Sequence, residues 1–125
     1  MTLNSGFELL PSEKNETWVV KEAFTVEYEG HFLTIPEGFR HDKYTFAPNV
    51  PDAKPAISHD RAYDYKKWDD GTPIKRKDAD GMLRMLMSIS PDKLTRDCAN
   101  LYWKYVRRFG WWGWYFKKTK KNANP

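Results

Sequence analysis

Cysteine is almost absent from this sequence, since Cys98 is the only one in 125 residues. A single cysteine cannot form an intramolecular disulfide, so a disulfide-stabilised scaffold is excluded and a reducing compartment is expected. The sequence also lacks any run of about 18 apolar residues, which excludes a membrane-spanning helix. Residues 1–10 show no basic segment followed by an apolar stretch, so we expect no secretory signal.

Acidic residues are missing from the end of the chain. Between Trp103 and Pro125 there are seven Lys and Arg residues and no Asp or Glu. The preceding part holds the other 14 of the 21 basic residues and all 17 acidic ones, although the whole chain has a net charge of +4. The body is therefore mildly acidic, and the positive charge belongs to the C-terminal region.

The length is typical of one domain. Aromatic residues make up 16% of the chain, which favours a core built largely from rings. We expect an extended N-terminal arm over 1–15, a single domain over 16–110, and an aromatic and basic tail over 111–125.

The segment 17–35 has the pattern of β-strands. Apolar and polar residues alternate from Phe24 to Tyr28, the period of a half-buried strand, and Glu29-Gly30 is a turn signal. Residues 32–35 would then return as the partner strand. The sequence predicts an N-terminal β-hairpin or small antiparallel sheet.

Prolines dominate the next segment and exclude a helix over 38–55, so we expect a long proline loop there. Three helices should follow. The first starts between Asp52 and Pro55 and runs to about Trp68, the second spans roughly 77–89, and the third runs from the capping Ser90 to Gly110. The predicted fold class is α+β. The third helix carries one apolar face, made of Leu94, Cys98, Leu101, Tyr105 and Phe109.

Chemistry-bearing residues are most closely grouped between 59 and 80. His59 and Tyr63 are four residues apart and share a helix face, and Asp80 lies on the next helix. Antiparallel packing of these helices would bring Asp80 to the His59 ring, where a carboxylate would fix the tautomer of a general base. A simpler reading makes the same residues a hydrogen-bonded edge of the core, with Asp60 an ordinary surface charge.

This segment resembles the phospholipase A2 core of parvovirus minor capsid proteins, in which an HD-x-x-Y helix is followed by an AD pair on a second helix. A longer part of the chain resembles a family of unknown function common in phages and prophages. Its pattern is found here in Pro36, Gly38, Phe39 and Asp42, then Pro48, then His59, Asp60 and Tyr63, then Ala79 and Asp80.

The resemblance implies a two-helix catalytic core. His59 would activate water, and Asp80 would orient the His59 ring. Tyr63 would support the hydrogen-bond network, and Asp60 would bind calcium. One departure concerns the calcium loop, because the stretch 43–49 contains no glycine. Asp42, together with Asn49, is then a candidate source of metal-binding oxygens.

Two functions follow from the resemblance. One is a phage or prophage ester hydrolase that acts on phospholipid with calcium. The other is a non-catalytic virion component, of the tail or baseplate, with a vestigial site. Both place the protein in the host cytoplasm or the virion.

The C-terminal tail combines rings and lysines, with Trp111, Trp112 and Trp114 followed by Lys117 and Lys118. This combination suits a phospholipid surface or a contact with other virion proteins. Single-stranded nucleic acid is the weakest of the candidate partners. Alternatively, the tryptophans pack back on the domain and the lysines are solvated.

Overall fold

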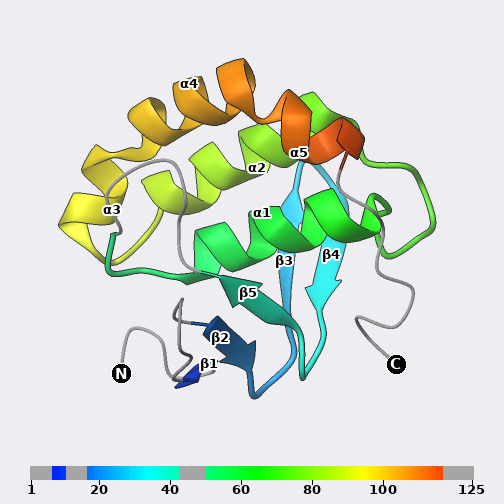
Figure 1. Ribbon diagram of the computed structural model, residues 1–125, viewed down its shortest axis with the longest axis horizontal. Helices are drawn as coiled ribbons and strands as arrows, with labels where there is room; N and C mark the ends of the chain where they lie inside the picture. The colour runs from blue at the N-terminus through cyan, green and yellow to red at the C-terminus, as the bar shows by residue number, and fades with distance from the viewer. Residues whose placement is uncertain (1–6, 11–16, 43–49, 117–125) are drawn as a thin grey trace.

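The computed structural model describes residues 7–10, 17–42 and 50–116. Two small antiparallel sheets come first in the chain. One has the strand order β1-β2-β5, and the other is the hairpin β3-β4 (Figure 1). The strands are β1 (Phe7–Leu10), β2 (Thr17–Val20), β3 (Phe24–Tyr28), β4 (His31–Ile35) and β5 (Arg40–Asp42).

The helices fill the C-terminal part of the described chain and confirm the α+β class. The predicted hairpin is confirmed with Phe24 opposite Ile35 and Tyr28 opposite His31. The helices are α1 (Lys54–Tyr65), α2 (Arg76–Ser88), α3 (Lys93–Asp97), α4 (Ala99–Phe109) and α5 (Trp111–Phe116). The prediction of a single third helix is therefore wrong, because the helix is interrupted at Cys98 and forms α3 and α4.

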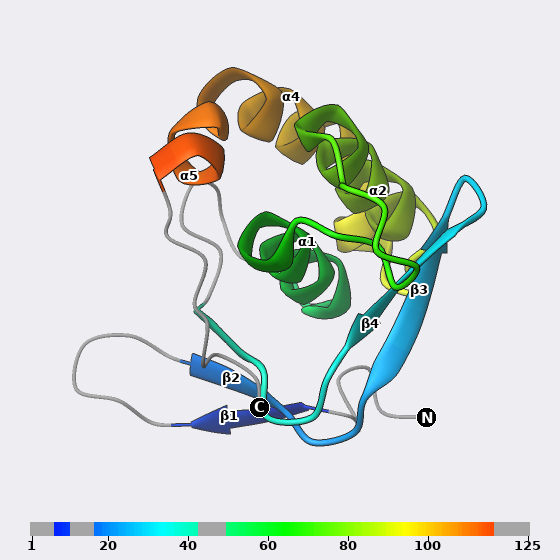
Figure 2. The same cartoon turned by 90° about the vertical axis from the view of Figure 1, so that its right-hand side faces the viewer.

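The helices are arranged in successive layers over the hairpin. α1 crosses β3 and β4, α2 packs beside α1, and α4 packs on α2 on the side away from the strands (Figures 1 and 2). In the described part of the chain, no helix is long and apolar enough to cross a membrane.

The main core lies between the hairpin and the first two helices. Leu33 and Ile35 of β4 are fully buried with Ile57 of α1 and Met82 of α2. The Tyr28 side chain reaches from the hairpin to α2, where its hydroxyl lies against Gly81. Glycine at this position therefore leaves room for the Tyr28 hydroxyl.

The connection from α1 to α2 is pinned to the edge of the hairpin. The Asp69 carboxylate accepts hydrogen bonds from the Thr34 backbone N–H at 2.8 Å and from its hydroxyl at 2.6 Å. Trp68 is buried, and its ring stacks on His31 with 5.1 Å between ring centroids. This anchoring fixes the turn that makes α1 and α2 adjacent.

A buried polar cluster, the Asp52 network, joins the segment before α1 to the start of α3. The Ser90 hydroxyl donates to Asp52 Oδ2 at 2.5 Å, and the Lys54 N–H donates to Asp52 Oδ1 at 3.1 Å. The N-terminal cap of α3 is Asp92, whose carboxylate accepts a hydrogen bond from the Thr95 N–H at 2.9 Å. The prediction of Ser90 as the cap is therefore wrong. The Thr95 hydroxyl in turn accepts from the Asp52 N–H at 3.3 Å.

The buried face of α3 and α4 differs from the predicted one. Thr95, Ala99, Tyr102 and Val106 point into the core, whereas Leu94, Leu101 and Phe109 of the predicted face are exposed. Both sets recur at intervals of three or four residues, so the helical period fits either orientation.

Regular structure also occurs on both sides of the predicted domain boundaries. β1, within the expected N-terminal arm, pairs antiparallel with β2, with Phe7 opposite Val20. α5 lies within the expected tail and contacts both α4 and α1. The parts of the arm over 1–6 and 11–15 lie outside the described residues.

Candidate functional site

The site starts on α1, where His59 and Tyr63 lie one turn apart on the same face. Pro55 stands at the start of this helix, where its missing N–H costs no intrahelical bond. The two rings are tilted against each other at a centroid distance of 4.3 Å. Tyr63 is buried, whereas the His59 side chain keeps 15% exposure.

Asp80 faces these two rings from α2 and is fully buried. His59 Nε2 lies 2.8 Å from Asp80 Oδ1, and the Tyr63 hydroxyl donates to the same oxygen at 2.6 Å. The turn at 69–73 thus brings together the three residues predicted for the proton-transfer network. Their catalytic role stays a prediction.

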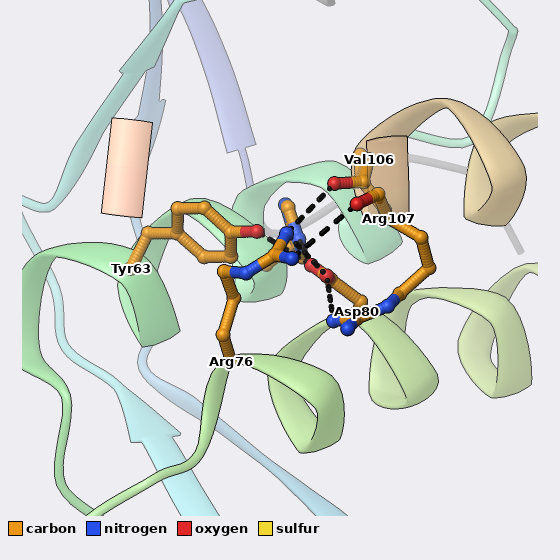
Figure 3. A network of polar contacts seen from close by, with 6 residues as sticks. Tyr63, Arg76, Asp80, Val106 and Arg107 are labelled. Atoms are coloured by element: carbon orange, nitrogen blue, oxygen red, sulfur yellow. Dashed lines mark hydrogen bonds and ion pairs between the residues drawn. The ribbon is translucent and has the colours of Figure 1, made fainter. Parts of the chain in front are cut away.

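The second oxygen of Asp80 is held by two arginines. Arg107 donates to Oδ2 from α4 at 2.8 Å, and Arg76 donates to it from the preceding turn of α2 at 3.3 Å (Figure 3). Arg76 also donates to the backbone carbonyls of Val106 and Arg107 at 3.0 and 3.3 Å. These carbonyls lie in the last turn of α4, where a cation is favourable. One carboxylate therefore connects α1, α2 and α4, and we call this group the Asp80 network.

The charges of the network shift two pKa values in opposite directions. Burial alone raises the pKa of Asp80, but the hydrogen bond and charge of His59, with hydrogen bonds from Tyr63 and Arg107, outweigh it and hold that pKa below its usual value. Burial raises the pKa of Tyr63, and the neighbouring Asp80 charge raises it further. Asp80 is therefore a stable anion, and Tyr63 stays a neutral donor.

The end of α4 and the start of α5 cover Tyr63. A Cβ atom on Gly110 would meet the Val106 backbone carbonyl oxygen and would lie 2.6 Å from the Tyr63 hydroxyl oxygen, so glycine leaves room for both in their present places. Trp114 packs edge-on against the Tyr63 ring at 5.0 Å, and Lys66 lies over the Trp114 ring. The network remains open to solvent at His59 and at Arg107, whose side chain is 33% exposed.

The two metal candidates are placed differently. Asp60 follows His59 on α1, so its side chain projects about 100° away around the helix, and it is half-buried. Asp42 is the last residue of β5, and its side chain lies outside the described residues, as does the stretch 43–49. Among the residues with described placement, no group of three or more His, Cys, Asp or Glu could hold a metal ion. Calcium binding stays a prediction.

The residues predicted for membrane or partner contact divide into two groups. Trp111 and Trp112 are exposed to 44% and 62%, whereas Trp114 packs inward on Tyr63. Lys117 and Lys118 lie outside the described residues.

Sequence reasoning missed both arginines of the Asp80 network and the packing role of Gly110. Arg76 precedes Asp80 by four residues on one helix, a spacing typical of an ion pair, and this signal was available in the sequence. Arg107 is 27 residues from Asp80 and has no local signal. Gly110 was predicted only as a helix end.

Comparison of the chain with models of known protein families, with curated proteins and with solved structures finds no match.

Proposed function

We propose that this chain is an ester hydrolase of the phospholipase A2 type, in which His59 is the general base. The observation that carries the proposal is the 2.8 Å contact between His59 Nε2 and the fully buried Asp80 carboxylate. A general base needs a fixed ring, a defined tautomer and access to water. The contact supplies the first two, and the partial exposure of His59 supplies the third.

The tautomer follows from the charge of Asp80. An ionised carboxylate can only accept hydrogen bonds, so Nε2 of His59 carries the proton that is donated to Oδ1. Nδ1 is then the acceptor. It removes a proton from a water molecule while the water oxygen attacks the ester carbonyl carbon. The tetrahedral intermediate collapses, the alkoxide leaves with the proton held on Nδ1, and the products are a carboxylic acid and an alcohol.

The remaining groups of the network hold Asp80 in place during these steps. Tyr63 donates to Oδ1, while Arg76 and Arg107 bind Oδ2, so both oxygens are fixed. Asp80 thus acts on the substrate only through His59, as a positioning residue. The exposed part of Arg107 adds positive charge beside the Asp80 carboxylate, which favours a phosphate-bearing ester such as a phospholipid.

The test is acyl release from phospholipid vesicles by the wild type and by His59→Gln, each with calcium and with a chelator. We expect a loss of at least about 100-fold in His59→Gln, the range for removal of a general base. His31→Gln is the matched control, because His31 lies on β4 and its ring stacks on Trp68. Its activity should equal that of the wild type, and thermal melts should show that all three proteins are folded.

The chelator arm tests the calcium prediction separately. If the metal takes part, the chelator and Asp60→Asn should each reduce acyl release while Asp97→Asn, at an exposed position on α3, should not. Wild-type protein that releases no acyl chain with or without calcium would contradict the hydrolase.

A second candidate function is a non-catalytic component of a phage particle. It is favoured by the bonds from Arg76 to the Val106 and Arg107 carbonyls, which make the Asp80 network a brace between helices. In that case His59→Gln lowers the melting temperature, no variant hydrolyses lipid, and the protein co-purifies with assembled particles.

A further inference from the structure

Exposed apolar side chains are concentrated on one part of the molecule. Of the nine large hydrophobic side chains that are exposed in the described residues, seven lie between Ile89 and Tyr115. α4 and α5 carry five of them, and both helices form the outer layer away from the strands (Figure 2). The five are Leu101, Phe109, Trp111, Trp112 and Tyr115.

These side chains form a continuous face along the two helices. Leu101, Tyr105 and Phe109 are spaced by four residues on α4 and lie on one side of it, and the rings of Tyr105 and Phe109 are in contact at 5.0 Å. The Gly110 N–H continues the helical bonding to Val106, so α5 extends this side with Trp112 and Tyr115. We call Leu101, Tyr105, Phe109, Trp112 and Tyr115 the α4–α5 face. An apolar surface of this kind marks an interaction site.

The surroundings of the α4–α5 face are basic. Lys104 and Arg108 are exposed and are also four residues apart on α4, next to the face. Arg108 lies 5.5 Å from the Phe109 ring centroid. From Cys98 to Pro125 the sequence contains no acidic residue, and four further lysines follow α5.

We propose that the α4–α5 face docks on an anionic phospholipid surface. Tryptophan and tyrosine rings favour the headgroup region of a bilayer, leucine and phenylalanine favour its acyl boundary, and lysine and arginine favour its phosphates. A second copy of the chain would bring two basic surfaces together, so charge disfavours it. The bases of single-stranded nucleic acid would stack on the rings, but nucleic acid offers no aliphatic surface for Leu101 to contact.

Docking on this face would place α4 and α5 between the lipid and the Asp80 network. Arg107 belongs to α4, and Trp114 of α5 packs on Tyr63, so the elements that contact the bilayer also form one wall of the site. This inference rests on the proposed function for its substrate class. Lipid binding is therefore measured on the His59→Gln protein, which lacks the proposed general base but keeps the α4–α5 face. Binding by this variant reports on docking alone, independently of hydrolysis.

The experiment is co-sedimentation with vesicles of phosphatidylcholine alone and of phosphatidylcholine with phosphatidylglycerol. We expect at least about tenfold tighter binding to the anionic vesicles, the size of effect that a few basic side chains at a membrane produce. Leu101→Ser with Phe109→Ser should weaken this binding at least about tenfold, because both apolar anchors are lost. Phe32→Ser is the matched control, since Phe32 is 51% exposed on β4, outside the face.

A second pair of substitutions separates charge from apolar contact. Lys104→Glu with Arg108→Glu should remove the preference for phosphatidylglycerol and leave binding to phosphatidylcholine unchanged. All substituted positions are exposed or half-buried, and circular dichroism melts should match the parent. The proposal is overturned by absence of binding to anionic vesicles, by equal losses in Phe32→Ser, or by a concentration-dependent dimer that only the Leu101 and Phe109 substitutions abolish. Binding to an oligonucleotide in preference to vesicles would also overturn it.

Discussion

Two buried aspartates hold this molecule together in different ways. Asp80 is fully buried and Asp52 is 5% exposed, so each needs donors that replace water. Asp80 receives side-chain donors from three helices, including two guanidinium groups and an imidazole. The donors found for Asp52 include the Ser90 hydroxyl and a neighbouring backbone N–H, which are uncharged.

The difference shows how the same side chain can serve two purposes. The Asp52 network joins segments that are near the ends of helices, and its hydroxyl and backbone donors carry no charge. The Asp80 network includes His59, whose imidazole can donate one proton and accept another, and leaves that group partly exposed. The second arrangement is the one that suits proton transfer.

The largest expected effect comes from removing the charge of Asp80. Asp80→Asn leaves Arg76 and Arg107 without their anion, and we expect it to lower the free energy of unfolding by about 3–5 kcal/mol, as for other broken buried ion pairs. Urea denaturation measures this loss. Asp97→Asn, which breaks the exposed pair with Lys93, should cost less than about 1 kcal/mol. Equal losses in the two variants would contradict the central role of Asp80.

A smaller effect is expected from filling the space beside Tyr63. Gly110→Ala places a methyl group against the Val106 carbonyl oxygen and the Tyr63 hydroxyl, and we expect about 1–3 kcal/mol of destabilisation from overpacking. Gly113→Ala is the matched control, because its Cβ would lie at an ordinary 3.8 Å from the Tyr63 ring. Gly110→Ala should also reduce acyl release, since the displaced hydroxyl no longer holds Asp80. A Gly110→Ala protein as stable and active as Gly113→Ala would show that this contact relaxes freely.

The same chemical change can be made in both networks, by removing one hydroxyl donor from each carboxylate. Ser90→Ala should cost about 1–2 kcal/mol, because a buried carboxylate loses a short hydrogen bond. Tyr63→Phe should cost only about 1 kcal/mol, because His59 and the arginines still bind Asp80. Denaturant titration of both variants compares the two losses, and the reverse order would mean that Asp80 depends on Tyr63 more than on its cations.

The smallest effect is the dependence of stability on acid. The folded-state pKa of Asp80 is lowered, so its contribution is present above the unfolded value near 4 and is lost as the pH falls through the folded value. Below about pH 4, stability of the wild type should fall with an extra slope of at most about 1.4 kcal/mol per pH unit from this group. Asp80→Asn should lack this part of the slope in melts from pH 5 to pH 2. The Thr95 bonds lower the pKa of Asp92 too, so Asp92→Asn should also flatten the curve.

Local patterns predicted much of the fold. The alternation from Phe24 to Tyr28 gave the hairpin, and the predicted first two helices match α1 and α2 within a few residues. The proximity of His59 and Asp80 followed from a short turn between two helices. These features are set by strand alternation, helix periodicity and one short turn, which can be recognised in the sequence.

The missed features depend on contacts between distant segments. Periodicity showed that α4 has apolar residues on its surface, but Leu101 and Tyr102 belong to different stripes, and only packing on α2 decides which is buried. Likewise, nothing near Arg107 in the sequence indicates that it binds a carboxylate on another helix. Tertiary packing decides such positions, and no local propensity encodes it.

The separation of 27 residues between Asp80 and Arg107 has a consequence for how the protein is made. Synthesis proceeds from the N-terminus, and segments fold as they emerge. A growing chain that ends before α4 already contains His59, Tyr63 and Asp80, but the carboxylate lacks the Arg107 guanidinium and the carbonyls that anchor Arg76. The pair of His59 and Asp80 therefore reaches its final geometry only after α4 has left the ribosome.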